Sequence, residues 1–293
     1  MTDPRGRNRY PSTLADRVRA ATGRTLLRTR PLHGGCVAEV LRLELNDGGA
    51  LVAKVSQGAD EGLVVEARML RYLAQHSRLP VPRVLYADAG LLLMDFVESE
   101  GALDAAAERH AAELLAELHG LTAPAFGFAW DSLIGALPQP NPRTEDWRAF
   151  FRDQRLLYMG REALVAGRLP AATFAALERL CGKLERYIDA DARPSLIHGD
   201  VWGGNVLARR GRIAAFLDPA IYYADAEIEL AFSTLFGTFG RAFFDRYGEI
   251  RPLRPGFFEV RRELYNLYPL LVHARLFGGG YAASVARSLA RFV

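Results

Sequence analysis

The first third of the chain alternates apolar and polar residues in short runs, the pattern of β-strands. The second and third runs, residues 36–45 and 50–56, are joined by Asn46-Asp47-Gly48-Gly49, which predicts a tight hairpin. A helical spacing then places Leu63, Glu66, Met69 and Leu73 on one face. The expected order is three strands, a helix and two strands, in residues 25–32, 36–45, 50–56, 60–75, 84–87 and 91–97.

The pattern changes to a helical period after residue 102. A segment rich in Gly and Pro, 124–143, reads as an ordered loop, and residues 195–218 contain short apolar runs separated by turns. Helices are predicted in 104–119, 145–158, 171–188 and from 225 to the end, with a break at 278–280. The pattern therefore predicts an α+β chain with a small β-rich N-lobe, 1–97, and a larger helical C-lobe, 98–293.

Composition is that of an ordinary globular protein with room for two lobes, at 293 residues, 50% hydrophobic and 24% charged. The net charge is only +3, and the short basic clusters carry no interleaved aromatic residues, so we expect no nucleic-acid partner. No apolar run is long enough for a membrane span, and the N-terminus lacks the apolar core of a signal peptide. Two distant cysteines, Cys36 and Cys181, favour a reducing, cytoplasmic setting.

The strongest chemical signal is the segment HGDVWGGN at 198–205, followed by FLDP at 216–219. Phosphoryl transfer needs a carboxylate that orients the attacking hydroxyl and accepts its proton, and oxygen ligands that hold Mg²⁺ on the phosphates. Asp200 and Asn205, five residues apart on a Gly-rich loop, can supply both functions at one place. Asp218, at the end of a following strand, can supply a further metal ligand.

A second signal is Lys54, on the third predicted strand. Only this residue and Lys183 are lysines among the 37 basic residues, so a retained lysine indicates a need for a compact ammonium group. Glu66 lies on the apolar face of the next predicted helix, where an unpaired carboxylate would be costly. A Lys54–Glu66 ion pair would explain both residues, and in kinases such a pair places the lysine on the α- and β-phosphates.

Two further segments fit a nucleotide site. Gly34-Gly35-Cys36, between the first two predicted strands, would let backbone N–H groups approach phosphate. Met94-Asp95-Phe96, at the end of the fifth strand, stands where a kinase hinge would offer backbone groups to adenine.

These residues belong to a wider resemblance. HGDVWGGN is similar to the HGDLWSGN of the fructosamine-kinase (ketosamine-3-kinase) family, and the resemblance extends over nearly the whole chain. PQPN at 138–141 with Trp147 and Phe150-Phe151, DPAIYY at 218–223 and LFGG at 276–279 resemble three more of its blocks, in the same order. Val201, Gly203 and the segment 224–227 depart from the usual residues, and none of these changes removes a catalytic group.

The resemblance implies a protein-kinase-like fold, shared with aminoglycoside phosphotransferases, and an ATP-dependent kinase that uses Mg²⁺. The acceptor would be the 3-hydroxyl of a ketosamine, such as a ribulosamine or fructosamine, on a free amine or a protein lysine, and the outcome would be deglycation. Asp200 would be the base, Trp202 a wall of the sugar site, and the metal and nucleotide residues those proposed above. We expect a monomer or a weak homodimer.

Two alternatives remain open. An aminoglycoside- or choline-type phosphotransferase would share Asp200, Asn205 and Asp218, although the PQPN and DPAIYY blocks argue against it. A nucleotide-binding pseudokinase would have lost the base, a metal ligand or the phosphate lysine, and none is lost here. A protein kinase is disfavoured, since the HGD loop lacks the arginine of HRD and no room remains for a long activation segment.

Cys36 carries a redox hypothesis. Backbone N–H groups of a phosphate-binding loop would favour a thiolate, so Cys36 would be the reactive thiol. Cys181 lies within an apolar helical pattern and is expected to be inert.

Overall fold

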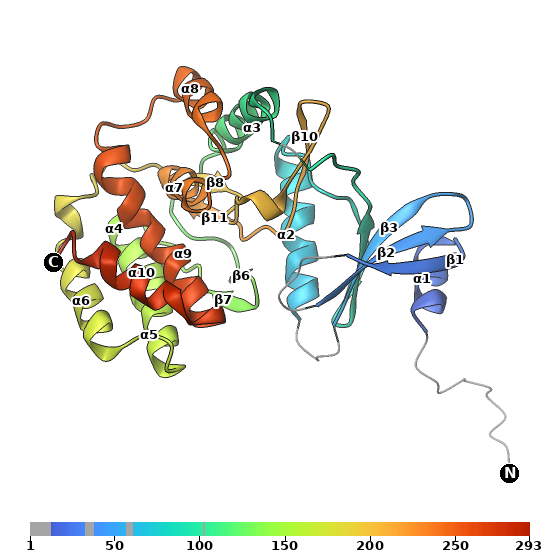
Figure 1. The fold of residues 1–293 in the computed structure, drawn as a ribbon, viewed down its shortest axis with the longest axis horizontal. Helices are drawn as coiled ribbons and strands as arrows, with labels where there is room; N and C mark the ends of the chain where they lie inside the picture. Colours follow the sequence, from blue (N-terminus) through green and yellow to red (C-terminus); the bar gives the residue numbers. More distant parts are fainter. Residues whose placement is uncertain (1–12, 33–37, 57–60, 102) are drawn as a thin grey trace, which may run out of the picture. The chain divides into compact units, whose positions relative to one another are not determined.

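The computed structural model describes residues 13–32, 38–56, 61–101 and 103–293 (Figure 1). The chain divides into two compact units. The first consists of Met1–Val64 and Arg83–Phe96, and the second of Val65–Pro82 and Val97–Val293. This grouping differs from the predicted ranges 1–97 and 98–293, because it assigns residues 65–82 to the second unit.

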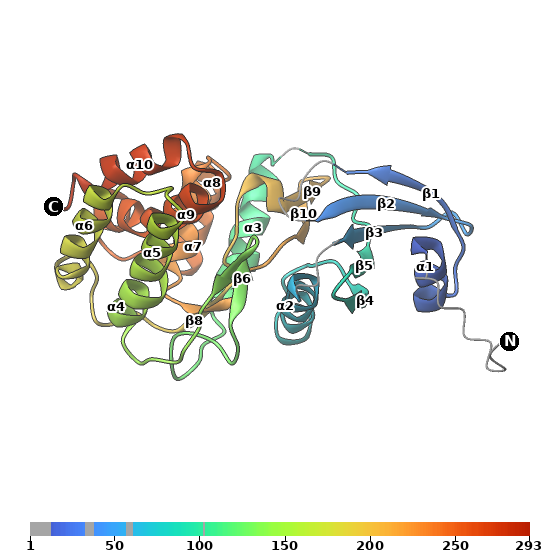
Figure 2. The ribbon, with the colours of Figure 1, turned by 90° about the horizontal axis from the view of Figure 1, so that it is seen from below.

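The first unit is an antiparallel sheet with one helix against it (Figure 2). Among the described residues the sheet has five strands in the order β1-β2-β3-β5-β4. The elements are α1 (Leu14–Thr22), β1 (Leu26–Pro31), β2 (Glu39–Leu45), β3 (Ala50–Val55), β4 (Val84–Asp88) and β5 (Leu91–Asp95). The alternating pattern thus predicted these strands correctly, including the β2–β3 hairpin.

Burial on one side of this sheet follows the alternation. Leu43, Leu51, Ala53 and Leu93 point into a small core that Val18 of α1 completes. Helix α1 begins at a capping box between Thr13 and Asp16 and ends at Gly23, which takes the left-handed conformation.

Helix α2 (Gly62–His76) explains why residues 65–82 belong to the second unit. Met69 and Leu73 are buried in the core of that unit. The guanidinium carbon of Arg68 lies 3.6 Å from the centroid of the Trp130 ring, and the hydroxyls of Tyr72 and Tyr223 are 3.1 Å apart. Apolar packing, a cation–π contact and a hydrogen bond therefore fix most of this helix to the second unit.

The second unit is mainly helical. Its helices after residue 102 include α3 (Ala105–Leu118), α6 (Ala171–Cys181), α7 (Glu227–Leu235), α8 (Arg241–Ile250), α9 (Arg262–Phe277) and α10 (Gly280–Leu289). One further continuous helical stretch consists of α4 (Trp147–Phe150), the π-helical segment η1 (Phe151–Leu157) and α5 (Tyr158–Val165). Helix α9 packs against α5, α7 and α10 (Figure 1). The helix predicted in 145–158 thus extends to Val165 and takes π-helical hydrogen bonding in its middle. The helix predicted in 171–188 ends at Cys181 and is followed by the short 3-10 turn η2 (Leu184–Arg186).

Short strands lie among these helices. The segment 124–143, predicted as a loop, contains a small hairpin of β6 (Ser132–Ile134) and β7 (Leu137–Gln139). Two further antiparallel pairs are β8 (Ser195–Ile197) with β11 (Tyr222–Ala224), and β9 (Val206–Arg209) with β10 (Arg212–Phe216). Because β8 leads into residues 198–205 and β10 into residues 217–221, these pairs set the positions of both segments.

None of the helices in the described ranges combines the length and apolarity needed to cross a membrane.

Candidate active site

Two neighbouring segments of the second unit carry the predicted catalytic chemistry, namely a catalytic loop (residues 198–205) and an aspartate loop (residues 217–221). Backbone hydrogen bonds join them at both ends. The amide of Leu217 donates to the Asn205 carbonyl at 2.8 Å, and the amide of Ala220 donates to the His198 carbonyl at 2.7 Å. The structure therefore holds Asp218 beside the loop that carries Asp200.

Asp200 and Asn205 are in direct contact. The side-chain amide of Asn205 donates to Oδ2 of Asp200 at 2.7 Å and to its carbonyl oxygen at 3.0 Å. These bonds use the nitrogen of the amide, so Oδ1 of Asn205 is the atom that can hold a metal ion. The five-residue spacing read from the sequence thus produces the expected pairing of a carboxylate with an amide.

The backbone of both loops takes conformations that their residue types allow. Gly199 has a φ of 88°, and a Cβ atom there would lie 2.2 Å from the Ala220 carbonyl oxygen, so only glycine fits where the loops meet. Asp218 has a φ of 54°, in the left-handed region that few residues other than glycine occupy. Such backbone strain is often found at functional sites.

His198 is buried at the start of the catalytic loop. The Asp200 amide donates to its Nδ1 at 3.3 Å, so in the neutral ring the proton is on Nε2. Burial lowers the pKa of His198, although the nearby carboxylates of Glu229 and Asp218 oppose this shift. A neutral His198 can therefore orient the backbone of Asp200 without adding charge to the site.

Trp202 is partly exposed in the same loop, and its indole ring lies across Gly204. A Cβ atom on Gly204 would be only 2.4 Å from the far edge of this ring. The glycine therefore leaves room for the indole, two residues after Asp200, and the place of Trp202 in a sugar site stays a prediction.

Sequence reasoning missed the carboxylate beneath the catalytic loop. Glu229 of α7 is buried and accepts hydrogen bonds from the amides of Gly199 at 2.6 Å and His198 at 3.3 Å. His119 donates from Nε2 to the same carboxylate at 2.8 Å, and its Nδ1 contacts the hydroxyl of Tyr247 at 2.8 Å. Burial by itself would raise the pKa of Glu229, but the hydrogen bonds from His119 and the Gly199 amide help to outweigh it, and this pKa lies below its ordinary value.

The PQPN block supports the aspartate loop. Gln139 donates to the Ala220 carbonyl at 3.0 Å and accepts from the Tyr268 hydroxyl at 2.7 Å. Asn141 accepts from the buried guanidinium of Arg155 at 2.6 Å, and that guanidinium lies 3.9 Å from the centroid of the Tyr222 ring. These contacts give the block a structural function, and Arg155 is a residue that the sequence did not reveal.

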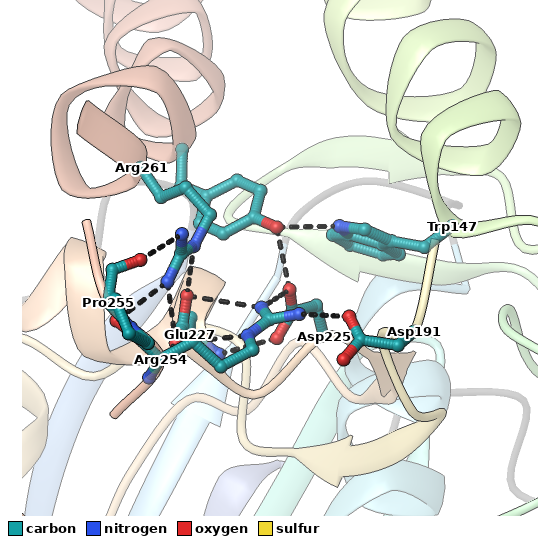
Figure 3. A network of polar contacts seen from close by, with 8 residues as sticks. Trp147, Asp191, Asp225, Glu227, Arg254, Pro255 and Arg261 are labelled. Carbon is teal, nitrogen blue, oxygen red and sulfur yellow. Dashed lines mark hydrogen bonds and ion pairs between the residues drawn. The ribbon is translucent and has the colours of Figure 1, made fainter. Parts of the chain in front are cut away.

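A buried network of charges fixes the beginning of α7 (Figure 3). Arg261 donates to Glu227 at 2.5 Å, while Arg254 pairs with both Glu227 and Asp225. Burial alone would raise the pKa of Glu227, but the hydrogen bonds from the two arginines hold this pKa below its ordinary value.

The network continues through the Tyr265 hydroxyl, which donates to Asp225 at 2.7 Å and accepts from Trp147 at 2.9 Å. Because Glu229 lies two residues after Glu227, this network also fixes the helix that carries it.

The predicted nucleotide residues lie partly within the described chain. Lys54 is buried in β3, and Glu66 is half-buried on α2 in the other compact unit, so their ion pair stays a prediction. In the predicted hinge, the Asp95 amide donates to the Arg83 carbonyl at 3.0 Å and is therefore not available to adenine. The flanking Met94 is buried, and the ring of Phe96 lies 4.3 Å from the Arg42 guanidinium carbon.

Gly34, Gly35 and Cys36 lie outside the described residues, so the predicted phosphate loop and the redox hypothesis for Cys36 stay predictions. Cys181 is buried as a free thiol, and burial raises its pKa to about 12. A thiol with such a pKa is rarely a thiolate at neutral pH, which agrees with the expected inertness of Cys181.

The described residues contain no cluster of three or more His, Cys, Asp or Glu side chains that could form a metal site by itself. Asn205 and Asp218 offer oxygen donors, the type that Mg²⁺ prefers. A magnesium ion that takes most of its ligands from phosphates and water needs only one or two protein oxygens, so this donor set fits the ion.

Comparison with known proteins identifies the family. The profile described as fructosamine kinase matches residues 12–293. The chain belongs to the fructosamine kinase family. It is 34% identical to a probable ketoamine kinase of Synechocystis, over 94% of this chain and 95% of that protein. It is 31% identical to a chloroplastic protein-ribulosamine 3-kinase of Arabidopsis thaliana, over 86% of this chain and 78% of that protein.

Solved structures agree with this assignment. A putative fructosamine-3-kinase of Thermobifida fusca superposes with a TM-score of 0.85 at 32% identity, over 95% of this chain and 99% of that one. An ADP-bound aminoglycoside phosphotransferase, at 15% identity, shares the fold alone with a TM-score of 0.61, over 93% of this chain and 95% of that one. The expected α+β, protein-kinase-like fold is therefore confirmed. As a member of this family the chain is an ATP-dependent ketosamine kinase, a phosphotransferase that acts on a hydroxyl group.

Proposed function

We propose that the enzyme transfers the γ-phosphoryl group of ATP to the 3-hydroxyl of a ketosamine, with Asp200 as the base. The proton of the hydroxyl passes to the Asp200 carboxylate as the oxygen attacks the γ-phosphorus. The bond between this phosphorus and the β,γ-bridging oxygen breaks, and ADP leaves with the electron pair. Positioning and charge stabilisation supply most of the catalysis in such a transfer.

The observation that carries this proposal is the contact between Asn205 and Asp200 in the catalytic loop, which backbone hydrogen bonds join to the aspartate loop. It supports one small site in which a base and two metal-holding oxygens lie close together. In this site Asn205 and Asp218 would hold Mg²⁺, which neutralises charge on the phosphates.

The product explains a function in deglycation. A phosphate on C3 of a ketosamine becomes a leaving group once a proton is removed from C1 and an enaminol forms. The phosphate departs with its bonding electrons, and water hydrolyses the resulting imine to release the amine. The proposed consequence is repair of a glycated amine, either free or in a protein.

The test is an ATP-consumption assay with ribulose-, fructose- and erythrulose-lysine, with kanamycin and choline as comparison acceptors, and with the phosphate position assigned by NMR. We expect turnover of at least one ketosamine and a phosphate on its third carbon. Efficient phosphorylation of kanamycin or choline, with every ketosamine ignored, would contradict the proposal.

The proposal includes a Lys54–Glu66 pair that places the lysine on the nucleotide phosphates. Lys54→Met is expected to lower kcat/KM for ATP about ten- to hundredfold, the value of a lost charge-assisted hydrogen bond. Glu66→Gln should cause part of this loss. Because the two residues would act as one unit, the double variant should lose little more than Lys54→Met alone. Steady-state kinetics at varied ATP measures this, and fully additive losses would show that no pair forms.

Three coarser expectations belong to the same proposal. Residues 1–97 and 98–293 would be the nucleotide-binding N-lobe and the C-lobe with the acceptor site. The setting would be cytoplasmic, consistent with the buried free thiol of Cys181. The enzyme would act as a monomer or weak homodimer, without a nucleic-acid partner.

A further inference from the structure

Aromatic side chains extend from the catalytic loop across the second unit in what we call the aromatic row: Trp202, Phe236, His273, Phe277 and Tyr281. The ring centroids of Trp202 and Phe236 are 6.2 Å apart, and those of Phe236 and His273 are 5.0 Å apart. His273 in turn lies 5.6 Å from Phe277 and 5.0 Å from Tyr281. The row therefore begins two residues after the proposed base and continues over α9 to α10.

The row is unusual in its exposure. Trp202 is 41% exposed, Phe236 42% and Phe277 49%. Phe258 is the one other Trp or Phe side chain in the described ranges with comparable exposure. Large apolar side chains gathered at a surface often mark a binding site, whereas single ones are normal.

The chemistry of the row limits what it can bind. The stretches of chain around its last four members, residues 230–244 and 264–293, contain no aspartate or glutamate, so they offer no carboxylate to the several ammonium groups of a polycation. The Nδ1 of His273 donates to the Pro269 carbonyl at 2.8 Å, and burial lowers the pKa of His273, so the ring is uncharged at neutral pH. The rings of the row thus offer apolar and aromatic faces, and the arginines of the same stretches, Arg241, Arg275, Arg287 and Arg291, disfavour a polycation further.

A ketosamine has two parts, a sugar and an amine substituent, joined at C1. If the third hydroxyl is at Asp200, the nitrogen on C1 is only two carbons away from the reacting position. Trp202 can then pack against the sugar and the adjacent ammonium, since aromatic faces attract cations. The substituent on that nitrogen can then reach the next ring of the row, Phe236, whose centroid lies 6.2 Å from that of Trp202.

We propose that the aromatic row binds the amine substituent of the acceptor, so that the enzyme prefers ketosamines of apolar or aromatic amines over those of small or polycationic amines. This inference rests on the proposed function and makes Phe236 and Phe277 determinants of specificity. Ring stacking and burial of the substituent should each favour an aromatic amine.

The experiment measures kcat/KM of the full-length enzyme, with saturating MgATP, for ribulosamines of glycine, leucine, phenylalanine and spermine. We expect the phenylalanine adduct to exceed the glycine adduct by about tenfold, with leucine between them and spermine lowest. In Phe236→Ala and Phe277→Ala this ratio of phenylalanine to glycine should fall toward one. Phe258→Ala is the matched control, because it removes an equally exposed ring elsewhere in the unit and should leave the ratio as in the wild type.

Two results would overturn the inference while leaving the proposed function intact. One is equal kcat/KM for the glycine and phenylalanine adducts in the wild type. The other is a wild-type preference that both alanine variants of the row retain. A complete lack of ketosamine turnover would instead reject the proposed function itself, and the inference with it.

Discussion

Asp200→Asn is expected to lower kcat by about 10²–10⁴, the usual contribution of a positioned base. The substitution should leave the loop intact, because the new amide oxygen can still accept the hydrogen bond that Asn205 donates to Asp200 at 2.7 Å. ATP affinity should remain close to the wild type, since this carboxylate acts on the acceptor hydroxyl. Turnover with the best ketosamine and the Kd for ATP measure the two effects separately. Near wild-type turnover would reject Asp200 as the base.

Asp218→Asn serves as the comparison for this result. The proposed function of Asp218 is to hold the metal ion, so its loss should raise the Mg²⁺ concentration needed for half-maximal rate. Asp200→Asn should change this requirement far less. Identical magnesium dependence in the two variants would contradict the separate functions of the base and the metal ligand.

The sequence predicted what depends on neighbouring residues. The β2–β3 hairpin follows from period-two alternation around Asn46-Asp47-Gly48-Gly49. The contact of Asp200 with Asn205 follows from one short Gly-rich loop, in which five residues leave few alternatives. In both cases the partners are close in sequence, so local chemistry determines most of the geometry.

The sequence could not predict contacts between distant residues. His119 and Glu229 are 110 positions apart, and each looks like an ordinary polar residue of a helix until the fold brings them together. The hairpin of β6 and β7 was missed because Gly135, Pro138 and Pro140 hide the alternation. Helix α2 was predicted correctly as a helix, but its attachment to the second unit depends on Trp130 and Tyr223, which only the tertiary structure places against it.

Glu229→Gln is expected to slow catalysis although Glu229 does not touch a reacting atom in the proposed mechanism. Its carboxylate accepts hydrogen bonds from Gly199, His198 and His119, and a carboxylate has only acceptors. Glutamine would turn a donor group toward at least one of these N–H groups. A buried mismatch of this kind costs about 1–3 kcal/mol and would displace the backbone next to Asp200. A misplaced catalytic group can cost about 10²-fold in rate.

Glu229 is thus proposed as a positioning residue, and its test must separate positioning from simple loss of stability. In Glu229→Gln we expect kcat to fall with little change in KM for ATP, measured well below the melting temperature on enzyme shown by circular dichroism to be folded. Tyr247→Phe is the matched control. It removes the hydroxyl at the far end of the same chain of bonds, 2.8 Å from His119, so it should lower Tm with much less effect on kcat. If both variants lose stability alone and keep kcat, Glu229 is only structural.

The pH dependence of stability gives an independent measure of the contribution of the Glu229 carboxylate. The pKa of Glu229 lies below its ordinary value in the folded protein, so its stabilisation is complete above the unfolded pKa, about 4.3. This stabilisation is lost as pH falls through the lower pKa of the folded state, because protonation of Glu229 removes acceptors for its hydrogen bonds. Glu229→Gln should therefore flatten the decline of Tm on the acid side of about pH 4.3, relative to the wild type. If Tm below about pH 4.3 declines equally in Glu229→Gln and the wild type, the Glu229 carboxylate is not the group whose charge holds the catalytic loop.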